Sequence, residues 1–217
     1  MSINLTAVAV VAVLGAIVAL LFAEARSSSS GILKAKMTAS SLFVGLALLF
    51  GALDSLFGQL VLAGLVLSWF GDLFLVGKSD KAFIAGLSAF LLAHIAYAAA
   101  FTTQPLDTPG IVYVATAMAV VAGVVLRWLW PGIPASMKAP VVVYVIVIAT
   151  MVTLAGGTTA LWGPTLLLAA AVFAASDVFV ARERFVQSAL ANRFLGLPLY
   201  YAAQLAFAFS VAGPGTR

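Results

Sequence analysis

Apolar residues along this chain run in long, nearly unbroken stretches, and the polar residues gather between these stretches instead of alternating through them. About 20 apolar residues suffice to cross the hydrocarbon core of a membrane as a helix, whereas the strands of a membrane barrel alternate over about ten residues. Glycine, proline and charged residues divide the chain into eight apolar stretches. We therefore expect an all-α integral membrane protein. Its residues 1–217 form a single transmembrane domain with spans at about 4–23, 38–55, 57–77, 82–101, 110–129, 139–155, 162–181 and 193–212.

The connections between these stretches are short and rich in glycine, proline, serine and threonine. They include residues 27–31, 102–110, 130–138 and 156–164. Segments of this length carry no core of their own and are typical of loops. We therefore expect loops at these positions and no soluble domain beside the helices.

Composition supports the membrane class. Hydrophobic residues make up 64% of the chain and charged residues 8%, and the mean hydropathy is +1.18. In a soluble domain about a quarter of the residues are charged. The chain has no cysteine, which excludes disulfides, thiolate catalysis and cysteine metal sites.

Positive residues fall almost entirely on one side of the predicted membrane. Loops that stay in the cytoplasm carry an excess of Lys and Arg. With eight spans, ten of the eleven Lys and Arg residues fall at one face and only Arg217 at the other, which places both termini on the non-cytoplasmic side of a bacterial inner or plasma membrane. The net charge of +4 follows from this bias, so we expect no nucleic-acid partner. The ten residues are Arg26, Lys34, Lys36, Lys78, Lys81, Arg127, Lys138, Arg182, Arg184 and Arg193.

The first apolar stretch has an alternative interpretation. Ala23, Glu24 and Ala25 follow it in the A-x-A-like pattern of a signal-peptide cleavage site. However, no basic residue precedes the stretch, the apolar run from Leu5 to Phe22 is longer than in most signal peptides, and cations follow it. We therefore expect a retained first span.

Ionisable residues inside the spans are few. Asp72, His94 and Asp177 lie within predicted spans, and Asp54 lies near the end of one, where we expect a solvated turn residue. Stripping water from such groups is costly, so each of them is a candidate functional residue. Asp72 precedes Lys78 by six residues and Asp177 precedes Arg182 by five. At about 1.5 Å per residue, the two carboxyls lie at the same depth, one to two helical turns below the cytoplasmic boundary. We therefore expect them to share one polar pocket.

A structural role competes with the functional one at each position. A lone aspartate near the boundary can be solvated or can cap a neighbouring helix, although this explains a pair at one depth less well. His94 can be a hydrogen-bonded packing residue, and one histidine does not make a typical metal site. We therefore expect neither a metal nor a cofactor.

Several linked motifs extend over successive spans. The stretch from Ser68 to Leu75 reads SWFGDLFL, in the form S-x-x-G-D-x-x-L. The next span carries the pattern F-x-x-G-x-x-x-F-x-x-x-H-x-x-Y-x-x-x-F between residues 83 and 101. Later spans carry Tyr144, Ile148 and Met151, then F-x-x-S-D ending at Asp177, then Y-Y-x-x-Q from Tyr200 to Gln204. In this order and spacing the motifs resemble the lysoplasmalogenase-like, or YhhN-like, family of multispanning membrane proteins.

The resemblance implies an eight-helix hydrolase that cleaves the vinyl ether bond of lysoplasmalogens to a fatty aldehyde and glycerophosphoethanolamine or glycerophosphocholine. It implies Asp72 and Asp177 as the catalytic residues, a lysophospholipid substrate and contact with membrane lipids. The chemistry needs an acid that protonates the alkene carbon and an anion that stabilises the resulting cation, as in glycosidases. The sequence does not assign these two roles between the aspartates, and the oligomeric state stays open.

Other polar residues are candidates for substrate binding. His94, Tyr97, Tyr201 and Gln204 are expected to position the glycerol oxygens or the water. Lys36, Arg182 and Arg193 are expected to receive the phosphate, and Ser68, Ser176 and Tyr200 to line the site.

Two other classes of protein use similar residues. An intramembrane aspartyl protease also has two membrane aspartates, but here the first motif lacks the second glycine of G-x-G-D, and GLPLY at 196–200 lacks P-A-L. A lipid carrier or proton-coupled transporter could use Asp72, His94 and Asp177 as a relay, although the chain shows no internal repeat and no clear pair of broken helices.

Overall fold

The computed structural model describes residues 5–77 and 79–214, and these residues form helices and loops without a strand. The long helices contain 20 to 23 residues each. A short 3₁₀ turn, η1 (Trp130–Gly132), and a short helix, α7 (Thr159–Trp162), interrupt the connections. The long helices are α1 (Leu5–Ala25), α2 (Ser29–Leu49), α3 (Leu56–Leu75), α4 (Asp80–Thr102), α5 (Thr108–Leu129), α6 (Ala135–Gly157), α8 (Thr165–Phe185) and α9 (Leu190–Ser210).

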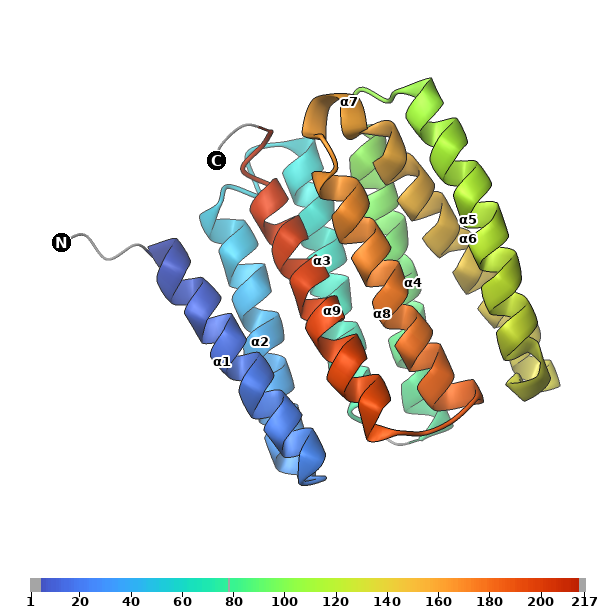
Figure 1. Ribbon diagram of the computed structural model, residues 1–217. Helices are drawn as coiled ribbons and strands as arrows, with labels where there is room; N and C mark the ends of the chain where they lie inside the picture. Colours follow the sequence, from blue (N-terminus) through green and yellow to red (C-terminus); the bar gives the residue numbers. More distant parts are fainter. Residues whose placement is uncertain (1–4, 78, 215–217) are drawn as a thin grey trace.

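The long helices stand side by side as an up-and-down bundle (Figure 1). Helix α9 packs against α1, α2, α3 and α8, whereas α5 lies at the edge and buries only Leu129. Both described ends of the chain lie at the same end of the bundle, where α7 also lies. Hydropathy and length make six of the helices, α2–α6 and α8, long and apolar enough to cross a membrane, so the chain is an all-α protein of the multi-pass membrane class.

Helix α9 carries more polar residues than a typical membrane span. Asn192, Tyr200, Tyr201 and Gln204 are all buried in it. These side chains lower its hydropathy, yet they lie inside the bundle and not on its outer surface. A polar helix in the interior of a membrane bundle is typical of a functional site, because buried polar groups need partners there.

The described cations gather at one end of the bundle, which we call the cationic end. It is the end where the connections α1–α2, α3–α4, α5–α6 and α8–α9 lie, and the cations occupy the helix ends beside these connections. Lys78 and Arg217, which also entered the predicted charge bias, lie outside the described residues, as does residue 4 of the first predicted span. The cations in the described part of the chain are Arg26, Lys34, Lys36, Lys81, Arg127, Lys138, Arg182, Arg184 and Arg193.

The second predicted span, 38–55, is displaced from the helix that forms. Helix α2 begins at Ser29, because the Ser28 hydroxyl accepts a hydrogen bond from the Gly31 amide at 3.3 Å and caps the helix. It ends at Leu49, before Gly51, whose φ of 81° favours glycine. The predicted loop 27–31 is therefore partly helical, and Lys36 lies on a helix two turns from its start.

Other predicted boundaries differ less. The predicted loop 130–138 contains η1 and the first turn of α6, and the predicted loop 156–164 contains α7. Asp54 lies exposed in the turn between α2 and α3, as expected. The remaining predicted spans coincide with long helices to within a few residues at each end.

Glycines bring α3 close to α4. A Cβ atom on Gly64 would lie 2.5 Å from the Tyr97 ring, and one on Gly71 would lie 2.6 Å from the Phe90 ring. Both distances are far shorter than a van der Waals contact. The aromatic rings of α4 therefore occupy the space that a side chain at either position of α3 would need. This close packing fixes the position of the helix turn that carries Asp72.

Candidate functional site

A cavity of about 750 Å³ occupies the half of the bundle nearest the cationic end. Asp72 of α3 and Asp177 of α8 both line it, as the shared depth of the two carboxyls predicts. Its polar lining at the cationic end includes Glu24, Lys36 and Arg193. Its apolar wall comes from α5, α6 and α8 and includes Met118, Val121, Ala122, Val125, Val141, Val145, Ile148, Ala171 and Ala174.

Asp72 is held by donors from two other helices. Lys36 Nζ of α2 lies 3.1 Å from Oδ1. The Tyr200 hydroxyl of α9 donates to Oδ2 at 2.7 Å, and the Ser40 hydroxyl of α2 donates to the same oxygen. Both carboxylate oxygens are therefore engaged, and the side chain is only 2% exposed.

Asp177 has fewer partners and more exposure. The Tyr144 hydroxyl of α6 donates to Oδ2 at 2.9 Å, and His94 Nε2 of α4 lies 3.3 Å from the same oxygen. His94 Nδ1 lies 2.6 Å from the carbonyl oxygen of Phe90, and its ring stacks on Phe173 with centroids 4.3 Å apart. The Asp177 side chain is 11% exposed, so the two carboxyls of the cavity differ in both partners and access.

Five of the predicted substrate-binding residues lie behind the cavity. The Tyr97 hydroxyl donates to Gln204 Oε1 at 2.6 Å, and the Tyr201 hydroxyl lies 3.4 Å from the Lys36 carbonyl oxygen. Ser68 is buried one helical turn from Asp72. The cavity lining includes neither these four residues nor His94. Of the five, His94 is the one for which the structure gives a direct contact with a carboxyl of the cavity.

Ser176 and Tyr200 do line the cavity. The Ser176 hydroxyl donates to the Phe173 carbonyl oxygen of its own helix at 2.7 Å. The Tyr200 hydroxyl donates to Asp72. Of the two residues, Tyr200 is therefore the one with a hydrogen bond to a carboxyl of the site.

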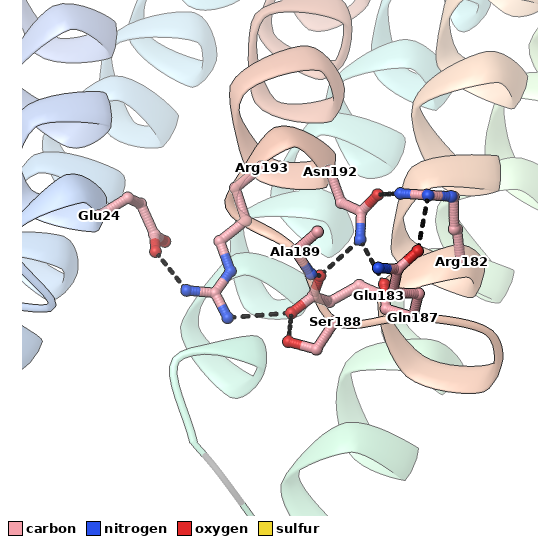
Figure 2. Close-up of polar contacts among 8 residues, drawn as sticks. All are labelled: Glu24, Arg182, Glu183, Gln187, Ser188, Ala189, Asn192 and Arg193. Atoms are coloured by element: carbon pink, nitrogen blue, oxygen red, sulfur yellow. Dashed lines mark hydrogen bonds and ion pairs between the residues drawn. The ribbon is translucent and has the colours of Figure 1, made fainter.

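The cations expected to receive phosphate are all engaged by other residues. Arg193 lies between two carboxylates, with Nη1 3.0 Å from Glu24 Oε2 and Nη2 3.0 Å from Glu183 Oε1 (Figure 2). Arg182 donates to Asn192 and Gln187 and does not line the cavity. Lys36 and Arg193 line it but carry ion pairs.

The network around Arg193 ties three helices together. Glu183 of α8 accepts from the Ala189 amide at 2.8 Å and from Asn192 at 2.6 Å, and so fixes the connection to α9. Glu24 adds the end of α1 to the same network (Figure 2). The rim of the cavity at the cationic end is therefore a hydrogen-bonded frame that includes α1.

Sequence reasoning missed Ser40 as a partner of Asp72 and Glu24 and Glu183 as rim residues. Ser40 follows Lys36 by four residues, the spacing of neighbours on one helix face, but this signal is visible only if α2 begins before residue 36. Tyr144 stood in a motif without a role, and the structure gives it one as the donor to Asp177. Among residues 5–77 and 79–214, no three His, Asp or Glu side chains cluster as metal ligands would.

Comparisons with known proteins agree with the motifs. The sequence model described as the YhhN family matches residues 31–211. The chain is 31% identical over 91 residues to "Lysoplasmalogenase TMEM86A" of Bos taurus and 36% identical over 92 residues to the protein of the same name in Homo sapiens. Each match covers 42% of this chain and 36% of the relative, so the chain spans about a third of the length of these relatives. No solved structure matches it.

Proposed function

Because this chain belongs to the YhhN family over residues 31–211, we propose that it is a membrane hydrolase that cleaves the vinyl ether bond of lysoplasmalogens. The products are a fatty aldehyde and glycerophosphoethanolamine or glycerophosphocholine. The observation that carries the proposal is that Asp72 and Asp177, from two different helices, line one cavity. The name of the two mammalian relatives supports the same reaction class.

The cavity suits a substrate with one hydrocarbon chain and one polar head. Its wall on α5, α6 and α8 is lined by valine, alanine, isoleucine and methionine, whereas its cationic end carries charged groups. Burying a chain against such a wall contributes about 0.8 kcal/mol per CH₂ group. The vinyl ether bond joins chain and glycerol, so a substrate bound in this direction brings that bond to the boundary between the two linings.

The reaction needs a proton donor and an anion. A proton first adds to the alkene carbon that is not bonded to oxygen, leaving an oxocarbenium ion. Water then adds to the carbon bonded to oxygen and releases a proton, which gives a hemiacetal. The hemiacetal breaks its bond to the glycerol oxygen, which takes a proton, and the aldehyde leaves. One carboxyl supplies the first proton, and a carboxylate stabilises the cation and orients the water.

We also propose that the chain forms one transmembrane domain whose eight long helices all cross the membrane, with the cationic end in the cytoplasm. The cations at that end support this orientation by the rule that cytoplasmic loops retain Lys and Arg. In a bacterium the corresponding membrane is the inner membrane. The cavity then opens on the cytoplasmic side.

The test is aldehyde release from an alkenyl lysophospholipid by the purified protein in detergent, carried out in heavy water. Protonation of the alkene carbon places one deuterium on the carbon next to the aldehyde carbonyl. Free aldehyde incubated in heavy water alone controls for later exchange. Detergent micelles have no second compartment, so product formation there also separates hydrolysis from transport. Failure to release aldehyde from substrates with either head group would contradict the proposal.

A further inference from the structure

The hydrogen-bond partners of the two carboxyls assign them different protonation states. We propose that Asp177, paired with His94, holds the transferable proton of the site, and that Asp72 is its fixed anion. This inference rests on the function proposed above and adds the roles that the sequence leaves open. His94 is then a positioning residue, since it acts through Asp177 and does not line the cavity.

The tautomer of His94 follows from its backbone contact. Nδ1 lies 2.6 Å from the Phe90 carbonyl oxygen, and a carbonyl oxygen only accepts hydrogen bonds. Nδ1 therefore carries a hydrogen. In a neutral ring the other nitrogen, Nε2, then has a lone pair and no hydrogen, so it can only accept.

Asp177 Oδ2 lies 3.3 Å from Nε2. Within residues 5–77 and 79–214, Nε2 is otherwise a buried nitrogen without a hydrogen-bond partner. An ionised Asp177 would place one lone pair against another in a buried site, at a cost typical of an unsatisfied polar group. One proton between the two atoms removes this conflict.

The surroundings favour that proton on Asp177 over a charged imidazolium. His94 is fully buried, and its ring stacks on Phe173 and meets the edge of Tyr144. In the described part of the chain, Tyr144 from α6 is the further titratable group with a contact to this pair. A buried ion pair needs further hydrogen bonds to offset its desolvation. Here the Tyr144 hydroxyl donates one to the carboxyl, and the Phe90 carbonyl accepts one that the neutral ring donates as well.

Asp72 has the opposite set of partners. It takes an ammonium on Oδ1 and two hydroxyl donors on Oδ2. Three donors around one carboxyl match an ionised group, which only accepts. The Lys36 ammonium balances its charge, so Asp72 has no proton to give.

The exposure of the two side chains agrees with these two roles. The Asp177 side chain is 11% exposed and that of Asp72 is 2% exposed. In the proposed reaction the Asp177 proton moves to the alkene carbon, and the carboxyl becomes a carboxylate that still accepts from Tyr144. The proton that water releases on adding to the oxocarbenium ion returns to Asp177, which restores the starting state without any further reactant.

Infrared spectroscopy tests the assignment without substrate, so its result is separate from whether the chain hydrolyses vinyl ethers. The protein is prepared with isotope-labelled aspartate in a detergent without ester groups, and the label identifies the C=O stretch of a protonated aspartate. We expect this band in the unmodified protein and in Asp72→Asn, and its loss in Asp177→Asn. In His94→Gln we expect the band to shift, because an amide oxygen is a weaker acceptor than an imidazole nitrogen.

Asp72→Asn leaves Lys36 without its carboxylate and can fail to fold. The double variant Lys36→Met/Asp72→Asn removes both charges and serves as the second comparison, with folding checked by size-exclusion chromatography. The assignment is overturned if the unmodified protein lacks the band, if the band survives Asp177→Asn, or if it is lost in the folded double variant. An unshifted band in His94→Gln would remove His94 from the proton-holding pair.

Discussion

The ammonium of Lys36 lies 3.1 Å from the Asp72 carboxylate inside the bundle, although the sequence pattern assigns Lys36 to a loop. Both side chains are nearly buried, with 11% and 2% of their surfaces exposed. A buried pair contributes little net stability, but removal of one partner leaves a charge that neither water nor protein neutralises. The pair therefore acts as a unit.

Lys36→Met is expected to lower the free energy of unfolding by about 3–5 kcal/mol, because it leaves Asp72 buried and unpaired. The double variant Lys36→Met/Asp72→Asn is expected to recover most of this loss. Unfolding in detergent, followed by circular dichroism, measures both. Lys34→Met, on the exposed face of the same helix, is the control. Equal losses in the single and double variants would show that the charges do not interact.

The contact between α3 and α4 is expected to tolerate no added methyl group at Gly64. The Tyr97 ring lies 2.5 Å from the place of the new Cβ, and it is held by Gln204 and by stacking on Phe207. Gly64→Ala is therefore expected to cost about 1–3 kcal/mol of stability. Gly45→Ala meets nothing within 4 Å and serves as the matched control. It is expected to be neutral or to stabilise α2 by up to about 1 kcal/mol.

The apolar wall of the cavity predicts that kcat/KM depends on the length of the alkenyl chain of the substrate. Ala122 lines the cavity. In the proposed function, Ala122→Trp therefore fills space assigned to the hydrocarbon chain of the substrate. We expect kcat/KM to fall at least about tenfold for long-chain substrates, equivalent to about 1.4 kcal/mol, and less for short-chain ones. Val124, two residues further along α5, is 63% exposed and does not line the cavity.

Val124→Trp is the control for this experiment and is expected to leave the chain-length profile unchanged. The measurement is the rate of aldehyde release over a series of alkenyl chain lengths. A profile that shifts equally in both variants would mean that the chain does not bind along this wall.

The rim network predicts that α1 is held to the bundle through Arg193. Arg193→Gln removes the ion pair with Glu24, whereas Glu183 keeps its contacts with Ser188, Ala189 and Asn192. Hydrogen exchange should therefore rise in the last turns of α1 and change little in the α8–α9 connection. Arg193 is 42% exposed, so salt should weaken the same contact in the unmodified protein.

Arg26→Gln is the matched control, because Arg26, the first residue after α1, stacks over Phe22 of that helix and is not among the residues of the rim network. If its exchange pattern matched that of Arg193→Gln, the Glu24 contact would not be what holds α1 in place.

The sequence was sufficient to predict the class of fold and that Asp72 and Asp177 line a common pocket. Long apolar stretches indicate helices, and a carboxyl at one depth in each of two spans points to a shared pocket, because each needs a polar partner in an apolar medium. The structure places Asp72 and Asp177 in one cavity lining. Hydropathy and the positions of the charged residues along the chain together carry this information.

Side-chain partners were harder to predict, because they depend on helix boundaries and rotation. The helix start at Ser29 is set by one serine cap, and a span predicted to begin at residue 38 leaves Lys36 outside it. Tyr144 carries no charge, so the sequence does not mark it as an ionisable candidate, although its hydroxyl donates to Asp177. The buried position of His94 behind Asp177 depends on how α4 and α8 pack, which hydropathy does not encode.

Aldehyde release by Asp72→Asn and Asp177→Asn, compared with the unmodified protein in detergent, tests the carboxyl pair most directly. We expect kcat to fall by about 10²–10⁴ in each variant, the contribution typical of a general acid or its partner. Asp54→Asn, in the exposed turn between α2 and α3, is expected to keep full activity. Near-normal aldehyde release by either cavity variant in folded form would contradict hydrolysis by this pair of aspartates.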